Sequence, residues 1–181
     1  NKPPLPVLAT ITQAIHQGRA VRLTYHSLSS GKTQREVVPF ALVDNGLRWH
    51  ARGFDRSKQE FRDLVITRME KPVLLESGDV LEHERGSHDI QWSRIVSMEM
   101  VPHPALERPE IVARDFAMTN GSLVENVPAA IAGYVLQQWN VDCSPDHSLD
   151  CRQYRLWLKD ALVLYGVANA VLAPGYREPQ K

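Results

Sequence analysis

The stretch LTYHSLSSGKTQREVVPFALVDNGLRWHARGFDRSKQEFRDLVITRM, residues 23–69, decides the fold of this chain. It predicts four short strands, because apolar and β-branched residues alternate with polar ones over short segments. These strands are expected at residues 21–27, 35–43, 47–54 and 61–67. Gly31 breaks the chain after the first strand, and Asn45-Gly46 is a strong signal for a tight hairpin turn. The stretch is therefore predicted to be a β-meander without a helix.

Several cations of this stretch are predicted to converge. Successive side chains of a strand point to opposite faces, so Arg48, His50 and Arg52 share one face of their strand. Arg62 and Arg68 are an even number of residues apart in the next segment, which favours the same face for both side chains. Guanidinium groups bind phosphate in bidentate fashion, which favours an anionic ligand. A solvated sheet face explains the same charges, since Lys and Arg mostly lie outside, and the residues leave both interpretations open.

The spacing of these residues resembles the WYL domain of bacterial transcription regulators, in the subgroup that represses phage-defence operons. The resemblance is carried by Tyr25-His26-Ser27-x-Ser29, Arg35 with Pro39 and Leu42, Arg48-Trp49-His50-x-Arg52, Phe61-Arg62-Asp63 and Arg68. The triplet Trp-Tyr-Leu that names the family stands here as Trp49-His50-Ala51. The identity of the family's ligand therefore does not carry over directly.

The resemblance implies a small Sm-like (SH3-like) β-barrel with a basic pocket that senses a nucleotide or nucleic-acid signal. It also implies that a winged helix-turn-helix upstream of this chain reads operator DNA. The aromatic rings of this stretch suit stacking on a base. The ligand-binding residues expected on these grounds are Tyr25, His26, Ser27, Arg35, Trp49, His50, Arg52, Arg62 and Arg68. Arg19, Arg48 and Arg56 are interpreted as surface residues outside the site.

The charge of the chain is unevenly distributed, although the net charge of its 181 residues is zero. Residues 1–68 hold 11 Lys and Arg against 5 Asp and Glu, a difference of +6, whereas residues 69–181 hold 10 against 16, a difference of −6. Opposite signs in the two parts predict that the first part binds anions and the second does not.

The chain is predicted to be α+β and mostly β, in two domains. Residues 1–18 are expected to be a Pro-rich linker with a short helix, 19–70 the WYL barrel, 71–90 a linker and 91–181 a C-terminal α+β domain. The last domain is predicted to contain, in order, a strand, a helix, a strand, a helix and a strand, which is compatible with a ferredoxin-like module. Its clearest helix follows Pro128, with Ile131, Val135 and Trp139 on one face as core or dimer surface. The domain also resembles the extension that joins two subunits in the WYL family, which implies a homodimer.

Metal binding and catalysis are not predicted. Cys143, His147 and Cys151 have a spacing that suggests a metal, but a structural zinc site needs four ligands, and Pro145 indicates a loop. Free thiols are therefore expected, and no cofactor. The chain has no Gly-x-Ser-x-Gly, His-Glu-x-x-His or Gly-rich phosphate loop, so we predict that it is not an enzyme. No apolar run is long enough to span a membrane and no signal peptide is seen, which indicates a cytoplasmic protein.

The sequence thus predicts the ligand-sensing and dimerisation part of a DNA-binding transcriptional repressor. An alternative is a stand-alone module that binds single-stranded nucleic acid, since a basic, aromatic barrel suits that role too. A third possibility is a purely structural oligomerisation unit, in which the arginines form ion pairs with Glu36, Asp63 or the acidic second part.

Overall fold

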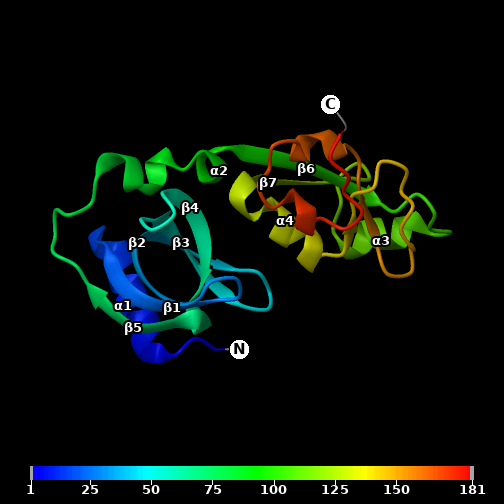
Figure 1. Cartoon of the computed structure of the whole chain (residues 1–181). Coiled ribbons are helices and arrows are strands. Elements are labelled where there is room, and N and C mark those ends of the chain that lie inside the picture. Colours follow the sequence, from blue (N-terminus) through cyan, green and yellow to red (C-terminus); the bar gives the residue numbers. More distant parts are fainter. Residues whose placement is uncertain (1, 180–181) are drawn as a thin grey trace. The chain divides into compact units, whose positions relative to one another are not determined.

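The structure is a computed structural model that describes residues 2–179. It divides into two compact units, residues 1–89 and 90–181, and the boundary along the chain falls between Asp89 and Ile90 (Figure 1). Both units combine a sheet with helices, and strand outweighs helix, so the predicted mostly β, α+β class is confirmed.

The first unit begins with helix α1 (Leu5–Gln17), which packs on strands β2 and β5 of the sheet described next. Its buried face is formed by Val7, Ile11 and Ala14. Gly18 ends the helix in the left-handed conformation at φ 60°, which glycine adopts without steric cost. The predicted short helix is therefore confirmed.

Five antiparallel strands form the sheet of the first unit, in the order β4-β3-β2-β1-β5. They are β1 (Val21–Ser27), β2 (Gly31–Asp44), β3 (Trp49–Asp55), β4 (Glu60–Val65) and β5 (Met69–Leu74). The short 3₁₀ helix η1 (Ile66–Arg68) connects the two edge strands β4 and β5, and the sheet curls around the core in Figure 1. This is the connectivity of a small SH3-like barrel.

Residues 71–74 correct the start of the predicted linker of residues 71–90, because they belong to the strand β5 (Met69–Leu74) that pairs with β1. Pro72 argued against a strand, since proline cannot donate to the ladder. The register shifts between Arg22 and Thr24, opposite Lys71 and Pro72, and Lys71 takes a positive φ of 50°. Pro72 falls at this irregularity of an edge strand, where no backbone N–H group is required to pair with β1, so the proline is tolerated there.

Residues 75–89, which we call the covering segment, pack on the outer face of the barrel rather than forming a free linker. Val80 joins a buried apolar cluster with Ala20, Val38 and Phe54. The segment contains two short 3₁₀ helices, η2 (Glu82–Glu84) and η3 (Gly86–His88). A Cβ on Gly86 would lie 2.6 Å from the ring of Phe40, so only glycine fits at that contact.

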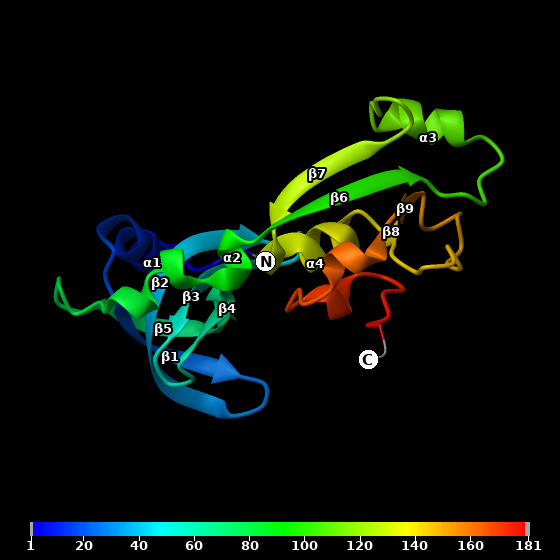
Figure 2. The same ribbon diagram turned by 90° about the horizontal axis from the view of Figure 1, so that it is seen from above.

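The second unit has a four-stranded sheet in the order β7-β6-β9-β8. Its elements are α2 (Ile90–Ser93), β6 (Ile95–Pro102), α3 (Pro109–Asp115), β7 (Leu123–Pro128), α4 (Ala129–Gln138), β8 (Val141–Asp142), β9 (Leu156–Leu158), η4 (Ala161–Leu164) and η5 (Ala170–Leu172). Figure 2 shows β6 and β7 as a long pair with α3 at the end where they connect. Because β6 and β7 pair directly, the strand order departs from the split βαβ connection of ferredoxin-like modules.

Helix α4 buries its small residues most deeply, whereas Ile131, Val135 and Trp139 form the face that the sequence left open as core or dimer surface. Its fully or nearly fully buried residues are Ala129, Ala130, Ala132, Gly133 and Leu136. Small residues let the helix approach closely, and a Cβ on Gly133 would lie 2.1 Å from the carbonyl oxygen of Asn169. The larger side chains Ile131 and Val135 are half-buried and Trp139 is exposed.

Candidate functional site

Tyr25 and Arg35 lie together on the inner face of the barrel, and both are buried. The guanidinium carbon of Arg35 lies 4.7 Å from the centroid of the Tyr25 ring, and the Tyr25 hydroxyl accepts a hydrogen bond from the Val65 N–H at 3.2 Å. Arg35 also donates to Asp55 Oδ2 at 2.7 Å and to Thr33 Oγ1 at 3.1 Å. Since the Asp55 side chain is fully buried, the charge of Arg35 is matched inside the protein.

Arg52 lies on the opposite face of β3 and is held by two carboxylates. Its Nε and Nη2 donate to Asp89 at 2.6 and 3.1 Å, and its Nη1 donates to Asp63 at 2.9 Å. Burial alone would lower the pKa of Arg52, but the hydrogen bond to Asp89 and the charge of Asp63 outweigh it and raise the pKa. Asp89 comes from the covering segment, so Arg52 fastens that segment to the barrel.

Arg56, which sequence reasoning placed outside the site, holds the covering segment as well. It donates to both carboxylate oxygens of Glu84 at 2.8 Å, to Asp79 Oδ2 at 2.8 Å and to Glu36 Oε2 at 3.2 Å. The hydrogen bonds to Glu84 are the main cause that raises the pKa of Arg56. The sequence carried no signal for this role, because Asp79 and Glu84 lie more than twenty residues away.

Three of the predicted residues keep exposed or weakly paired groups. The Arg62 side chain is 40% exposed, and its Nε lies 3.4 Å from Glu60 Oε1. Arg68 is half-buried in η1, and its guanidinium makes no ion pair or hydrogen bond with any residue of 2–179. Trp49 is 38% exposed and lies one position beyond the last β3–β4 pair, His50 with Val65, at the end of the barrel where η1 begins. These groups are accessible to a ligand.

His26 and Ser27 lie at the β1–β2 hairpin. His26 Nε2 is 3.1 Å from Glu70 Oε1, and Lys32 Nζ is 3.4 Å from Glu70 Oε2, all three side chains being well exposed. The contact with His26 is the main cause that lowers the pKa of Glu70, followed by the contact with Lys32. Ser27 Oγ lies 3.1 Å from Ser29 Oγ within the turn. The hairpin is thus a polar surface on which positive charge is partly neutralised.

His50 is buried on the same face as Arg52. Burial lowers its pKa, while the negative charge of Asp63 acts in the opposite direction. The neighbouring Ala51 belongs to the apolar core of the barrel, as expected for alternation along a strand.

The nine predicted residues therefore lie in three settings. Tyr25 and Arg35 are inside the barrel, His50 and Arg52 are buried on its outer face, and the other five are partly or well exposed. The ion pairs of arginine with Asp63 and Glu36, which the sequence suggested as an alternative, are present for Arg52 and Arg56. Binding of a ligand by these residues stays a prediction.

The cysteines of the second unit are free thiols. Cys143 is fully buried, and its burial raises the pKa of the thiol. Cys151 is half-buried, with Sγ 3.6 Å from the carbonyl oxygen of Ala105. The His147 ring packs edge-on against His103 and Trp157. Within residues 2–179, no three His, Cys, Asp or Glu side chains are grouped as ligands of a metal ion.

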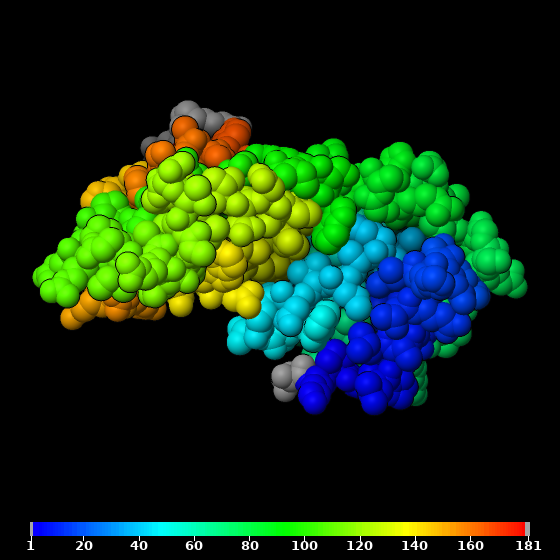
Figure 3. Space-filling view, turned by 180° about the vertical axis from the view of Figure 1, so that it is seen from behind, coloured from blue at the N-terminus to red at the C-terminus, as the bar shows by residue number. Residues whose placement is uncertain are grey.

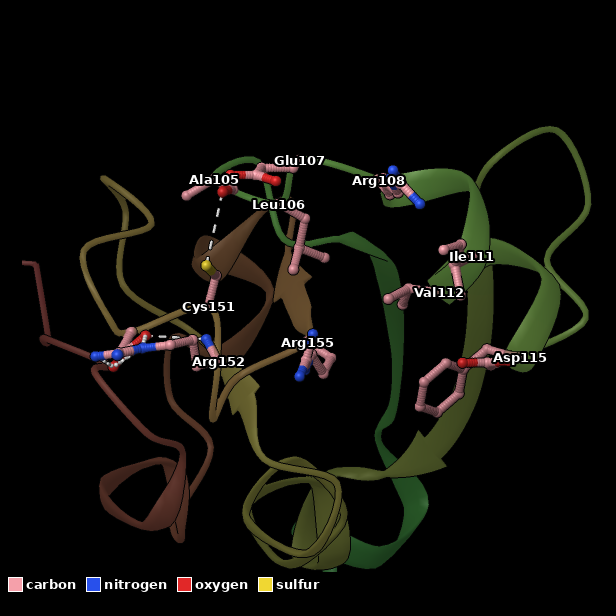
Figure 4. A pocket seen from close by; sticks show the side chains of 12 residues that line it. Ala105, Leu106, Glu107, Arg108, Ile111, Val112, Asp115, Cys151, Arg152 and Arg155 are labelled. Carbon is pink, nitrogen blue, oxygen red and sulfur yellow. Dashed lines mark hydrogen bonds and ion pairs between the residues drawn. The ribbon is translucent and has the colours of Figure 1, made fainter.

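A hollow of about 770 Å³ lies in the second unit, between the segment of residues 105–116 and the loop of residues 150–155. Figure 4 shows Cys151, Arg152 and Arg155 on one side of it and Arg108, Ile111 and Asp115 on the other. Separately, none of the helices formed by residues 2–179 has both the length and the apolar character needed to cross a bilayer.

Two family models match the chain. The WYL domain matches residues 6–74, and the C-terminal dimerization domain of the BrxR transcriptional regulator matches residues 95–164. The second model is a domain of a transcriptional regulator, in agreement with the prediction that the chain is not an enzyme.

The curated relatives include proteins named DNA-binding transcriptional repressor CapW. That of Stenotrophomonas maltophilia is 33% identical over 144 residues, covering 75% of this chain and 45% of the relative. That of Escherichia coli is 28% identical over 144 residues, covering 78% and 47%. The chain thus spans a little under half the length of the relatives it matches.

Two solved structures are similar over much of the chain. Proteasome accessory factor B/C (PafBC) of Arthrobacter aurescens is 20% identical with a TM-score of 0.39, covering 93% of this chain and 26% of that one. A CRISPR Cas-related protein is 13% identical with a TM-score of 0.37, covering 74% and 45%. At these TM-scores neither likeness bears on the fold or the site. The family models show that the chain contains a WYL domain followed by the C-terminal dimerization domain of the BrxR transcriptional regulator.

Proposed function

We propose that this chain is the ligand-sensing and dimerisation part of a DNA-binding transcriptional repressor. Its WYL domain would bind a nucleotide or a short nucleic-acid signal that modulates operator binding. The names of the CapW relatives and of the two matched domains support a repressor that acts as a homodimer in the bacterial cytoplasm. The operator would be read by a part of the regulator that this chain does not comprise.

The observation that carries the proposal is the unequal pairing of the arginines. Arg35 and Arg52 are buried and matched by carboxylates. Arg62 has only a long contact with Glu60, and Arg68 meets no carboxylate among residues 2–179. Exposed guanidinium groups without a close partner remain able to bind phosphate without displacing a carboxylate.

Trp49 supports the nucleic-acid character of the ligand. Its ring is exposed at the end of the barrel where η1 carries Arg68. Stacking of a base on an aromatic ring contributes about 1–3 kcal/mol in single-strand binding. An exposed aromatic ring and a free guanidinium group on the same barrel are therefore suited to a nucleotide rather than to a simple anion.

Regulation requires more than binding. A ligand shifts a conformational equilibrium only when its affinity differs between the two states. For this chain, we infer that the two states differ in the arrangement of the dimer, since a dimerization domain follows the WYL domain. The ligand would change the spacing of the DNA-reading parts of the two subunits.

The test is fluorescence anisotropy of a short labelled single-stranded oligonucleotide titrated with the chain at low and near-physiological salt. The variant is Arg62→Ala/Arg68→Ala. The matched control is Arg22→Ala/Lys58→Ala, which removes two exposed cations elsewhere on the same unit. Removing one phosphate-binding cation should reduce the slope of log affinity against log salt by about 0.7, so a reduction of about 1.4 is expected for the variant.

The outcomes separate a site from general electrostatic attraction. Weaker binding and a smaller slope in the Arg62/Arg68 variant alone support the assignment. Equal decreases in the variant and the control would show that only net charge matters. No binding by the parent chain at either salt would refute a nucleic-acid ligand.

A further inference from the structure

The hollow in the second unit has an apolar floor that water reaches. Leu106, Ile111, Val112 and Phe116 supply the apolar part. Val112 also belongs to the core, but Ile111 is 49% and Phe116 36% exposed. Figure 3 shows the segment from α3 to β7, in light to yellow green, as a broad part of the surface of this unit. Large apolar side chains exposed on a concave surface are unfavourable in water unless a bound molecule covers them.

Four charged side chains line the hollow without a direct partner. They are Glu107, Arg108, Asp115 and Arg155. All four are exposed, and none of their charged groups makes an ion pair or a hydrogen bond with any residue of 2–179. The other two charges of the lining satisfy each other, because Arg152 Nη2 donates to Asp150 Oδ2 at 2.7 Å. The hollow therefore offers two available cations and two available anions.

Two of these charges, of opposite sign, lie on opposite sides of the hollow. Arg155 belongs to the side of the loop, and Asp115 is the last residue of α3 on the other side (Figure 4). The apolar side chain of Val112 lies between them in this view. Glu107 and Arg108 are neighbours in the chain, so their charges largely offset each other. A cation and an anion thus face each other across an apolar surface.

Hydrogen bonds hold the wall that carries Arg155. The His103 N–H donates to the carbonyl oxygen of Arg155 at 2.9 Å. The His103 ring is fully buried, with Nε2 3.1 Å from Asp142 Oδ2, and its Nδ1 accepts from the Ala105 N–H at 3.2 Å. Cys151 Sγ lies 3.6 Å from the carbonyl oxygen of Ala105. Such a network fixes the wall before any ligand binds, which lowers the entropic cost of binding.

We propose that this hollow binds a small zwitterion with an apolar body, namely an apolar amino acid or a short apolar peptide with free ends. Arg155 would bind its carboxylate, since guanidinium groups bind carboxylates in bidentate fashion. Asp115 would bind its ammonium group, and its apolar side chains would cover the floor. The volume of about 770 Å³ falls in the range of about 300–1,000 Å³ that is typical of small-molecule sites. A single amino acid does not fill that volume, so a short peptide fits it better.

Other occupants match the hollow less well. A simple anion would meet the charges of Glu107 and Asp115, and a simple cation would meet those of Arg108 and Arg155. A second copy of the same hollow would not cover the floor, because two concave surfaces leave a gap between them. The inference goes beyond the proposed function and does not depend on any ligand of the WYL domain.

The test is a chemical-shift titration of the isotope-labelled full chain with leucyl-leucine, followed by NMR. At the efficiency typical of small ligands, the dissociation constant should be about 0.2 mM. Shifts are expected within residues 105–116 and 150–155, which line the hollow. Glycyl-glycine has the same charged ends without apolar side chains and should bind at least about 10-fold more weakly. Free leucine and leucyl-leucyl-leucine distinguish an amino acid from a peptide as the ligand.

Two variants of the chain and two modified ligands assign the charged contacts. Arg155→Gln should weaken the binding of leucyl-leucine about 10-fold or more, but not that of its carboxamide, which lacks the carboxylate. Asp115→Asn should weaken the binding of leucyl-leucine about 10-fold or more, but not that of its N-acetyl derivative, which lacks the ammonium group. The matched control Glu110→Gln/Arg114→Gln removes two charges of α3 outside the hollow and should bind as the parent does. The spectrum of each variant also verifies that it is folded.

Each outcome decides the proposal. Weaker binding of leucyl-leucine by both variants, with no effect on the matching modified ligand, supports it, whichever of leucine and its peptides binds more tightly. Equal binding of glycyl-glycine and leucyl-leucine would overturn the role of the apolar floor. Variants that bind leucyl-leucine as the parent does would overturn the charged contacts. No shift in these residues up to about 10 mM, about fifty times the expected dissociation constant, would overturn the site and leave the proposed function of the WYL domain intact.

Discussion

Replacing Arg52 by methionine should destabilise the first unit strongly. Methionine keeps the apolar stem but removes the guanidinium, which makes three hydrogen bonds to Asp63 and Asp89. The Asp89 side chain is only 3% exposed, so its charge would lose the balancing charge of Arg52 in a place that water hardly reaches. Removing one partner of a buried ion pair costs about 3–5 kcal/mol, and we expect Arg52→Met to fall in this range.

A second substitution makes the reasoning specific. Asp89→Asn removes the negative charge while its amide oxygen remains an acceptor. In the double variant Arg52→Met/Asp89→Asn, the buried positive charge of Arg52 and one of the negative charges that it balances are removed together. The cost of the double variant should therefore be smaller than the sum of the two single costs by at least about 1 kcal/mol.

The assay must report on the first unit by itself. Urea unfolding of the full chain followed by hydrogen exchange provides this, with peptides from β3 and β4 compared against peptides from β6. The peptides of β6 should not change, because Arg52 and both carboxylates belong to the first unit. A destabilisation of less than about 1 kcal/mol in β3 and β4, or additive single costs, would refute the role given to this ion pair.

Two further predictions concern buried groups. Burial lowers the pKa of His50 in the folded chain below its usual value of 6.5. The unfolded chain therefore binds the proton more readily than the folded chain. The stability of the first unit should fall as the pH drops through 6.5. His50→Gln should flatten that fall in urea titrations between about pH 7.5 and 5.5, and an unchanged profile would contradict the prediction. Gly133→Ala would raise intrinsic helix propensity, but its Cβ would lie 2.1 Å from the backbone oxygen of Asn169. The second unit should therefore lose about 1–3 kcal/mol, measured by the same exchange method on peptides of α4, whereas a gain would show that the contact relaxes freely.

Much of the first sheet could be predicted because its signals are local. Gly18 ends α1, Asn45-Gly46 turns the chain between β2 and β3, and the alternation of residues 21–27 matches β1. Strand β5 was missed because Pro72 normally argues against a strand, and only the irregular pairing with β1 tolerates it. That pairing is a tertiary feature, which a local pattern does not contain.

The second sheet was harder to predict for the same reason. The sequence of strands and helices could be anticipated up to β9, but β8 has only two residues and owes its place to its pairing with β9. In α4, the sequence left the face of Ile131, Val135 and Trp139 open as core or dimer surface, and it gave no sign that the small residues would be the most deeply buried. The helix instead packs its small residues inward, since the carbonyl of Asn169 comes too close for a Cβ at Gly133.

The candidate site shows where pattern reasoning about charge stops. Alternation placed Arg52 and His50 on one face, and they do share it. Whether an arginine there is free depends on a carboxylate that folding brings to it. Asp89 is 37 residues away from Arg52, and no periodicity links the two. The sequence can therefore count cations on a face, but it cannot tell which of them remain available to a ligand.

This distinction decides how a scan of the basic residues must be interpreted. Substituting Arg35 or Arg52 removes a buried partner of Asp55 or Asp89, so binding would fall through unfolding even if neither arginine contacts a ligand. Substituting Arg62 or Arg68 removes an exposed or half-buried guanidinium without leaving a buried charge unpaired. Surface substitutions of that kind usually change stability by less than about 0.5 kcal/mol. Reduced binding by a variant whose stability is unchanged therefore identifies a contact, whereas reduced binding that follows stability identifies the scaffold.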